Sequence, residues 1–240
     1  MKLKRVEARE LTGEHFRYYD VVMTAFVVIL VLSNIIGAAK GAVIDVGGHS
    51  FEFGAGILFF PLSYILDDVL TEVYGYARAR RVIWVAAGAL IFMAAMEWVV
   101  VHMPPAAWWK DQGAYETVFG SGWRIVLASL TAFWAGDIVN SVILAKMKIL
   151  TDGKWLWTRT ISSTIFGEGI DSLIFYPIAF VGIWPAAQVI QVLITNWMLK
   201  VLWEVVLTPV TYAVVGFLKR REGIEVFDRG TDFTPFRTSV

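Results

Sequence analysis

The sequence predicts an all-α integral membrane protein with six transmembrane helices, and three observations predict this class. Hydrophobic residues make up 57% of the 240 residues and charged residues only 18%, whereas soluble domains carry about 25% charged residues. The mean hydropathy is +0.61. Six stretches are mostly apolar over about 20 residues, the length that spans a bilayer. These stretches are residues 20–39, 56–76, 82–102, 123–147, 160–183 and 186–217.

The first stretch ends at Gly37-Ala38-Ala39, which resembles the small-residue cleavage site of a signal peptide. Its apolar run is too long for a signal peptide, and acidic residues such as Glu7 precede it. We therefore expect a helix that is retained in the membrane. Residues 43–53 then alternate in polarity around Gly47-Gly48, which predicts a short β-hairpin on the outer face.

The distribution of Lys and Arg orients the predicted helices, because cytoplasmic loops of membrane proteins are rich in these residues. Most of the 21 Lys and Arg residues lie before the first helix, after the second, between the fourth and fifth, or after the sixth. Six helices place these four segments on one side, and the opposite side has Lys40, Lys110 and Arg124. We therefore expect an inner-membrane protein with both termini in the cytoplasm.

Residues 1–219 are expected to form one six-helix transmembrane domain, and residues 220–240 a polar, mobile cytoplasmic tail. Six helices divide into two halves of three. Because three is an odd number, an internal repeat would have to be inverted. The sequence contains no visible repeat, so the inverted 3+3 arrangement is a hypothesis from the number of helices alone.

Ionisable residues interrupt four of the six predicted helices. A charged side chain at the centre of a transmembrane helix costs about 2.5–3.5 kcal/mol on insertion scales, so such residues are functional candidates when they converge. Within each helix they recur at intervals of one or two turns, which places them on shared faces. The ionisable residues are Asp67, Asp68 and Glu72 in the second helix, Asp137 in the fourth, Glu168 and Asp171 in the fifth, and Lys200 and Glu204 in the sixth. Asn140 in the fourth helix and Asn196 and Trp203 in the sixth share their faces.

A rise of about 1.5 Å per residue places Asp67, Asp137, Asp171 and Lys200 near the middle of a core about 30 Å thick. Lys200 could neutralise Asp137 or Asp171 in a purely structural pair. One lysine cannot neutralise all the carboxylates, so either some of them carry a proton or a cavity hydrates them. Both alternatives predict a pathway or a binding site. Arg159, at the start of the fifth helix, is either a topology determinant or a residue that contacts the substrate or forms an ion pair.

The predicted lining suits a planar, nitrogen-rich heterocycle. A guanine-like edge offers two parallel N–H donors to one carboxylate, and Asn140 or Asn196 can address a ring carbonyl. Trp134 or Trp203 offers a surface on which a flat ring can stack. A thiamine-like ligand or a biogenic amine would fit the same lining.

Three separated segments contain recognisable motifs. The first is Phe60-Pro61-Leu62-Ser63-Tyr64-Ile65-Leu66-Asp67-Asp68, which continues through Tyr74-Gly75. The second is Trp155-Leu156-Trp157-Thr158-Arg159-Thr160 with Asp171-Ser172-Leu173-Ile174-Phe175, and Asn196-Trp197 with Lys200 forms the third. Together they resemble the queuosine precursor transporter family, formerly known as a family of vitamin uptake transporters. Glu168 and Gly169 depart from the family pattern, in which a Gln and an aliphatic residue are more often expected.

The resemblance implies uptake across the inner membrane of 7-deazaguanines, which feed the queuosine modification of tRNA. Examples are 7-cyano-7-deazaguanine (preQ0), 7-aminomethyl-7-deazaguanine and queuine. The leading hypothesis is alternating access around an acidic pocket at the midplane. The candidate substrate-binding residues are Asp67, Asp137, Asn140, Glu168, Asp171, Asn196, Lys200 and Trp203. The candidates for ion coupling or gating are Asp68, Glu72, Arg159 and Glu204.

Other classes of function are disfavoured by the composition. A formal net charge of zero provides no basic field for nucleic acid, and there is no cysteine for thiol chemistry. The three histidines lie at or beyond the ends of the apolar runs, so neither a metal site nor another cofactor is expected. No protease motif is visible, and the chain is not expected to be an enzyme.

The sequence contains no phosphate-binding loop. ATP could therefore drive transport only if the chain were the substrate-capturing subunit of a vitamin importer with a separate ATPase module, which is the alternative reading. Pairing of two copies into a homodimer is a further hypothesis. The partners expected under the leading reading are the lipid bilayer and the small-molecule substrate.

Overall fold

The computed structural model describes residues 3–11, 15–37, 40–120 and 123–237. The chain is mostly helical. Its helices are α1 (Tyr19–Leu32), α2 (Phe60–Val69), α3 (Tyr76–Val101), α4 (Gln112–Phe119), α5 (Trp123–Leu150), α6 (Leu156–Phe180) and α7 (Ala186–Glu222). Two π-helical turns extend α1 over Ser33–Gly37 and α2 over Leu70–Tyr74. The strands are β1 (Lys4–Glu7), β2 (Gly41–Val46), β3 (His49–Gly54) and β4 (Ile224–Phe227).

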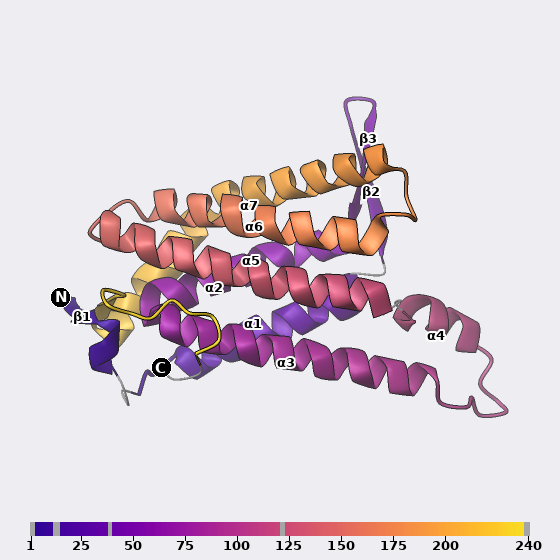
Figure 1. The fold of residues 1–240 in the computed structure, drawn as a ribbon, viewed down its shortest axis with the longest axis horizontal. Helices are drawn as coiled ribbons and strands as arrows, with labels where there is room; N and C mark the ends of the chain where they lie inside the picture. Colours follow the sequence, from indigo (N-terminus) through magenta and orange to yellow (C-terminus); the bar gives the residue numbers. More distant parts are fainter. Residues whose placement is uncertain (1–2, 12–14, 38–39, 121–122, 238–240) are drawn as a thin grey trace.

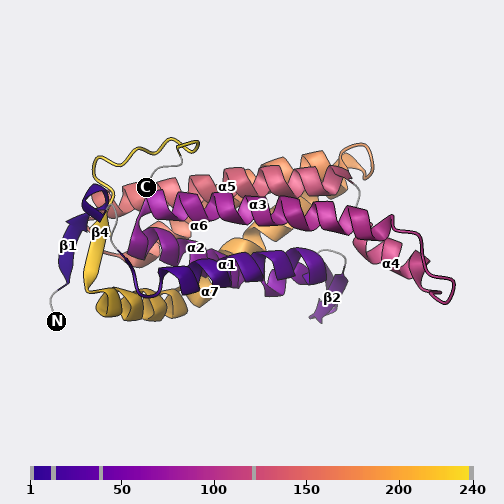
Figure 2. The ribbon, with the colours of Figure 1, turned by 90° about the horizontal axis from the view of Figure 1, so that it is seen from below.

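The long helices run roughly side by side in one elongated bundle (Figures 1 and 2). β1 and β4 lie together at one end, which we call the terminal end. The hairpin β2–β3 and the short helix α4 lie at the opposite end, the hairpin end. A hydrophobic core joins α1, α2 and α3, and its fully buried members include Phe26, Val69 and Ile83.

The predicted helical membrane class is confirmed in its coarse form. Among the residues that the structure describes, four segments are long and apolar enough to cross a membrane: Tyr19–Gly37, Tyr76–Val101, Gln112–Leu150 and Ala186–Glu222. The second and fifth predicted spans are also helical, but α2 with its π-helical turn is short, and α6 is interrupted by polar residues. The count of six spans therefore stays a prediction.

An antiparallel hairpin occupies the region where the sequence predicts one. β2 pairs with β3 from Gly41 opposite Gly54 to Val46 opposite His49. The two residues of the turn, Gly47 and Gly48, have φ angles of 60° and 83°. Two-residue turns between twisted strands favour positive φ at both positions, which glycine adopts without strain. The location of this hairpin on the outer side of a membrane stays a prediction.

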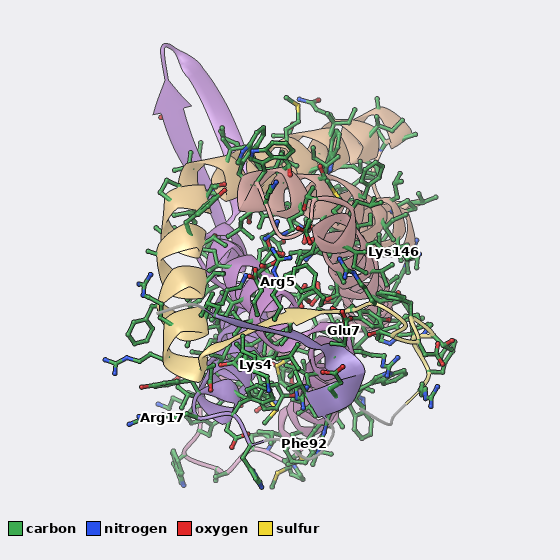
Figure 3. The ribbon with its side chains drawn as sticks, turned by 90° about the vertical axis from the view of Figure 1, so that its left-hand side faces the viewer. Lys4, Arg5, Glu7, Arg17, Phe92 and Lys146 are labelled. Carbon is green, nitrogen blue, oxygen red and sulfur yellow. The ribbon has the colours of Figure 1, made fainter. Side chains whose placement is uncertain are left out.

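The C-terminal segment is held against the bundle, in contrast to the mobile tail expected from its polar composition. α7 continues to Glu222, so the expected boundary at residues 219–220 falls inside a helix. β4 then pairs in parallel with β1, from Lys4 opposite Ile224 to Glu7 opposite Phe227. Figure 3 looks onto the terminal end, where β1 crosses the bundle with Lys4, Arg5 and Glu7.

Polar groups of the tail satisfy hydrogen-bond donors of α3, which explains why a polar segment docks. The Asp228 carboxylate accepts a hydrogen bond from the Tyr76 backbone N–H at 3.1 Å, in the first turn of the helix. The Arg80 guanidinium donates to the carbonyls of Asp232 and Thr234. Burial raises the pKa of the Asp228 carboxyl. The hydrogen bonds that it accepts from Tyr76 and Thr231 lower this pKa in part.

Candidate functional site: a buried polar cluster between α2, α5, α6 and α7

Two glycines allow α5 and α6 to cross closely beside the candidate site. A Cβ on Gly136 would lie 3.0 Å from the carbonyl oxygen of Gly167, and a Cβ on Gly167 would lie 2.8 Å from the Cβ of Asn140. Small residues at such crossings are typical of membrane helices, because they let the backbones approach. The crossing places Asn140 of α5 beside Gly167 and Asp171 of α6 beside Gly136.

Lys200 of α7 joins two carboxylates of α6. Its Nζ atom lies 2.7 Å from Oε2 of Glu168 and 2.7 Å from Oδ2 of Asp171. The Tyr64 hydroxyl of α2 donates a further hydrogen bond to Glu168 at 3.0 Å. The structure thus pairs Lys200 with Asp171, one of the two partners considered from sequence, and adds Glu168. Tyr64 was not singled out, although it precedes Asp67 by one helical turn and so shares its face.

Asn140 joins the two adjacent aspartates of α2. Its Nδ2 atom donates hydrogen bonds to Oδ2 of Asp67 at 2.8 Å and to Oδ1 of Asp68 at 2.9 Å. The Ser141 hydroxyl lies 3.4 Å from Asp67 and accepts a hydrogen bond from Thr71 at 3.0 Å. Asp67 and Asp68 are only 2% and 0% exposed. Neither aspartate has an ion-pair partner within residues 3–11, 15–37, 40–120 and 123–237.

Two further buried carboxylates complete this region. Asp137 of α5 and Glu204 of α7 are 8% and 2% exposed, and the described part of the chain offers neither of them a cation within ion-pair distance. The Oε1 atom of Glu204 and the Oδ2 atom of Asp68 are buried without a hydrogen-bond partner. The cluster therefore divides into a half that contains Lys200 and a half that is acidic and lacks a cation.

Glu72 belongs to a separate ion cluster nearer the terminal end. It is fully buried, and Arg159 of α6 donates to both of its carboxylate oxygens at 2.8 Å. Lys148 of α5 and Lys219 of α7 lie 3.2 Å and 2.5 Å from Oε1 of Glu72. Lys219 also binds Glu225 of β4 at 2.9 Å. The geometry favours the ion-pair interpretation of Arg159 that the sequence left open.

Sequence reasoning missed Lys148 and Lys219 because both lie in Lys-rich segments that it used only for topology. A usable signal existed, since each falls in the last turns of a long helix rather than in a loop. Their burial, at 1% and 7% exposure, separates them from ordinary cytoplasmic lysines.

Three of the residues considered for ligand recognition have surroundings other than the carboxylates of the cluster. The Asn196 side chain donates to the carbonyl of Val192 in its own helix at 2.9 Å. Trp203 is half-buried on α7. Trp134 packs its ring against Trp84 and Phe236, with ring centroids 5.6 Å and 5.5 Å apart, so it belongs to an aromatic group shared with the tail.

The arrangement of donors also bears on metal binding. Within the described ranges, no group of three or more His, Asp or Glu side chains is placed to hold a metal ion. The polar cluster can instead accept hydrogen bonds from a ligand, because carboxylate oxygens dominate its acidic half.

Comparison with protein families identifies the class. The model of a family described as "Putative vitamin uptake transporter" matches residues 54–214, a region that contains every residue of the polar cluster. The chain belongs to this transporter family. It is therefore a transporter and not an enzyme.

Several curated proteins are similar to this member of the family. A "Probable queuosine precursor transporter" of Bacillus subtilis (strain 168) is 30% identical over 159 residues, which cover 66% of this chain and 69% of the relative. The "Queuosine precursor transporter" of Escherichia coli (strain K12) is 24% identical over 163 residues, 67% of this chain and 71% of the relative. A "Probable queuosine precursor transporter" of Haemophilus influenzae is 25% identical over 142 residues, 59% of this chain and 57% of the relative. No solved structure matches.

Proposed function

We propose that the chain is an inner-membrane uptake transporter for queuosine precursors, with 7-cyano-7-deazaguanine (preQ0) as the leading substrate. The observation that carries this proposal is the buried acidic cluster, which lies inside the region that matches the transporter family. The names of the three relatives supply the class of substrate. A 7-deazaguanine has the paired ring N–H and amine donors that a buried carboxylate can accept.

The proposed transporter crosses the membrane six times. α6 packs against α5 and α7, and α2 contacts α1, α5 and α7, so each of these helices buries part of its surface against other helices. Helices that face the interior of a membrane protein can carry polar residues that lipid-facing helices cannot. This explains how α2 and α6 can carry buried carboxylates such as Asp67 and Glu168 within a membrane. The excess of Lys and Arg at the terminal end supports a cytoplasmic location for both termini.

The proposed substrate site is the midplane pocket expected from sequence. Asp67 would accept the paired N–H donors of the heterocycle, and the Asn140 amide, which already bonds to Asp67 at 2.8 Å, would hold that carboxylate in place. Lys200 would hold Glu168 and Asp171 in place from the other side. The remaining members proposed for the lining are Asp137, Asn196 and Trp203.

The Glu72 cluster is proposed to form the gate at the cytoplasmic side. Four elements meet there, because Glu72 follows α2 while its cationic partners belong to α5, α6 and α7. A pathway from the midplane to the terminal end must separate at least some of these ion pairs. Alternating access then requires the cluster to form and break in each cycle.

Purified full-length protein in liposomes provides the test. We expect saturable uptake of isotope-labelled 7-cyano-7-deazaguanine, weaker competition by guanine, and no competition by thiamine. Binding of thiamine in place of the deazaguanine would refute the assignment of substrate. Asp67→Asn should abolish uptake while the protein still inserts, whereas Asp20→Asn, an exposed site at the start of α1, should transport normally.

The alternative of a subunit that borrows an ATPase module has no support from the comparisons. Uptake by the isolated protein without ATP would exclude it. Copurification of an ATPase with the chain, together with uptake that depends on ATP, would instead favour it.

A further inference from the structure

Glu204 is a buried carboxylate to which the described residues offer no compensating cation. It lies in the middle of α7 with 2% of its surface exposed, and its Oε1 atom has no hydrogen-bond partner. Asp68 of α2 is fully buried, and its Oδ2 atom is equally without a partner. α2 and α7 pack against each other. Among the charged groups around Asp68, Glu204 acts on it most strongly.

The charged groups that act on this pair are carboxylates. Asp67 and Glu72 come from the same helical segment as Asp68, and Asn140 of α5 is its hydrogen-bonding neighbour. Glu168 of α6 acts electrostatically on Glu204. The nearby cations are engaged elsewhere, because Lys200 binds Glu168 and Asp171 while three other cations surround Glu72.

Two ionised carboxylates in this position would be costly, because burial penalises each charge and like charges repel. A proton removes one charge and requires no further ligands. It also gives one carboxyl an O–H group that can donate to an oxygen now lacking a partner. A proton is therefore the occupant that satisfies the site with the fewest additional groups.

We propose that Asp68 and Glu204 form a proton-binding pair that couples substrate uptake to the transmembrane proton gradient. This inference rests on the proposed transport function. One proton enters the pair from the outer side, neutralises one of the two carboxylates, and leaves to the cytoplasm when the transporter opens inward. No bond other than the O–H bond forms or breaks.

The Asn140 amide provides a physical link between this pair and the proposed substrate site. Its two N–H groups bind Asp67 and Asp68 at once. A substrate that binds Asp67 weakens or strengthens the hydrogen bond between Asp67 and one of these N–H groups. A proton on Asp68 does the same to the hydrogen bond between Asp68 and the other N–H group. Loading of the two sites is therefore expected to be coupled through one side chain.

The test separates proton coupling from substrate recognition. Full-length protein in liposomes is compared with Glu204→Gln and Asp68→Asn for three properties: binding of 7-cyano-7-deazaguanine, exchange of internal for external ligand, and accumulation driven by an imposed pH gradient. Glu97→Gln serves as the matched control, because Glu97 is a half-buried carboxylate on α3 away from the cluster. The pH inside the liposomes is followed with a dye.

The wild type and Glu97→Gln should accumulate ligand and carry protons inward with it. Glu204→Gln should keep binding and exchange, because an amide resembles the protonated carboxyl, but lose accumulation and the linked proton flux. Glu204→Asp should restore part of the accumulation. Accumulation by Glu204→Gln at the wild-type level would overturn the proposal, and so would accumulation by the wild type driven by sodium but not by pH. Failure of the wild type to bind or exchange the ligand would refute the proposed function itself.

Discussion

The guanidinium of Arg159 donates hydrogen bonds to both carboxylate oxygens of Glu72, each at 2.8 Å, in a fully buried position. This bidentate geometry is the strongest arrangement available to an arginine and a carboxylate. Arg159 lies near the start of α6 and Glu72 in the π-helical turn after α2, so their contact ties together two helices that are far apart in sequence.

Replacing Glu72 with Gln should destabilise the protein and loosen the terminal end. The change removes the carboxylate that three buried cations share, although Lys219 keeps its contact with Glu225. Removing one partner of a buried ion pair costs about 3–5 kcal/mol. We expect a lower unfolding temperature in detergent. Because the chain has no cysteine, Ser163→Cys can serve as a clean reporter. It lies fully buried on α6, and its labelling from the terminal side should rise in the Glu72→Gln background.

Arg159→Lys is the matched test of geometry at this site. It keeps the charge but loses the two parallel hydrogen bonds. We expect labelling between those of the wild type and Glu72→Gln. Unchanged labelling in both variants would argue against a gate at this cluster.

Replacing Lys200 with Met should destabilise the bundle, because Glu168 and Asp171 would then lack their cation. The expected loss is about 3–5 kcal/mol in the free energy of unfolding. The triple variant Lys200→Met, Glu168→Gln, Asp171→Asn removes the charge conflict and should recover most of the stability. It should not recover transport of 7-cyano-7-deazaguanine. Recovery of transport would show that these three residues serve only the fold.

The level of the polar cluster could be predicted from sequence, because the rise per residue of a helix fixes depth once a span is recognised. Asp67 bonds to Asn140. Lys200 reaches α2 through Glu168 and Tyr64, one helical turn before Asp67. The choice of partners could not be predicted in the same way. Whether Lys200 binds Asp137 or Asp171 depends on the rotation of each helix about its axis, which apolar faces on all sides do not specify.

The contacts made by the terminal segments also could not be predicted from the sequence. β1 and β4 are far apart in the chain, and neither segment has an apolar pattern that predicts a strand. Glu222 illustrates the difficulty, since its carboxylate accepts hydrogen bonds from the backbone N–H groups of Arg17 and Tyr18 just before α1. A side chain at the end of the last helix thus stabilises the start of the first, and no local pattern indicates this.

Replacing Asp228 with Ala should release the tail from α3. The carboxylate accepts a hydrogen bond from Tyr76 N–H in the first turn of that helix, and losing such an acceptor costs about 1 kcal/mol. We expect faster proteolysis after β4. Asp232→Ala is the control, because its carboxylate bonds to Thr234 and Arg237, which belong to the tail itself. Equal proteolysis rates in the two variants would contradict a specific role for Asp228.

Replacing Gly167 with Ala should force α5 and α6 apart at the level of the cluster. The new Cβ would lie 2.8 Å from the Cβ of Asn140, closer than two carbons can approach. Overpacking of this kind costs about 1–3 kcal/mol, and the shift of Asn140 would disturb its bonds to both aspartates. We therefore expect a lower unfolding temperature together with weaker binding of 7-cyano-7-deazaguanine. Gly88→Ala on α3 is the matched control, because a Cβ there meets nothing within 4 Å and alanine favours a helix by about 1 kcal/mol over glycine. If Gly167→Ala lowered stability but left ligand affinity at the wild-type value, the close crossing would serve packing alone and Asn140 would not position the substrate site.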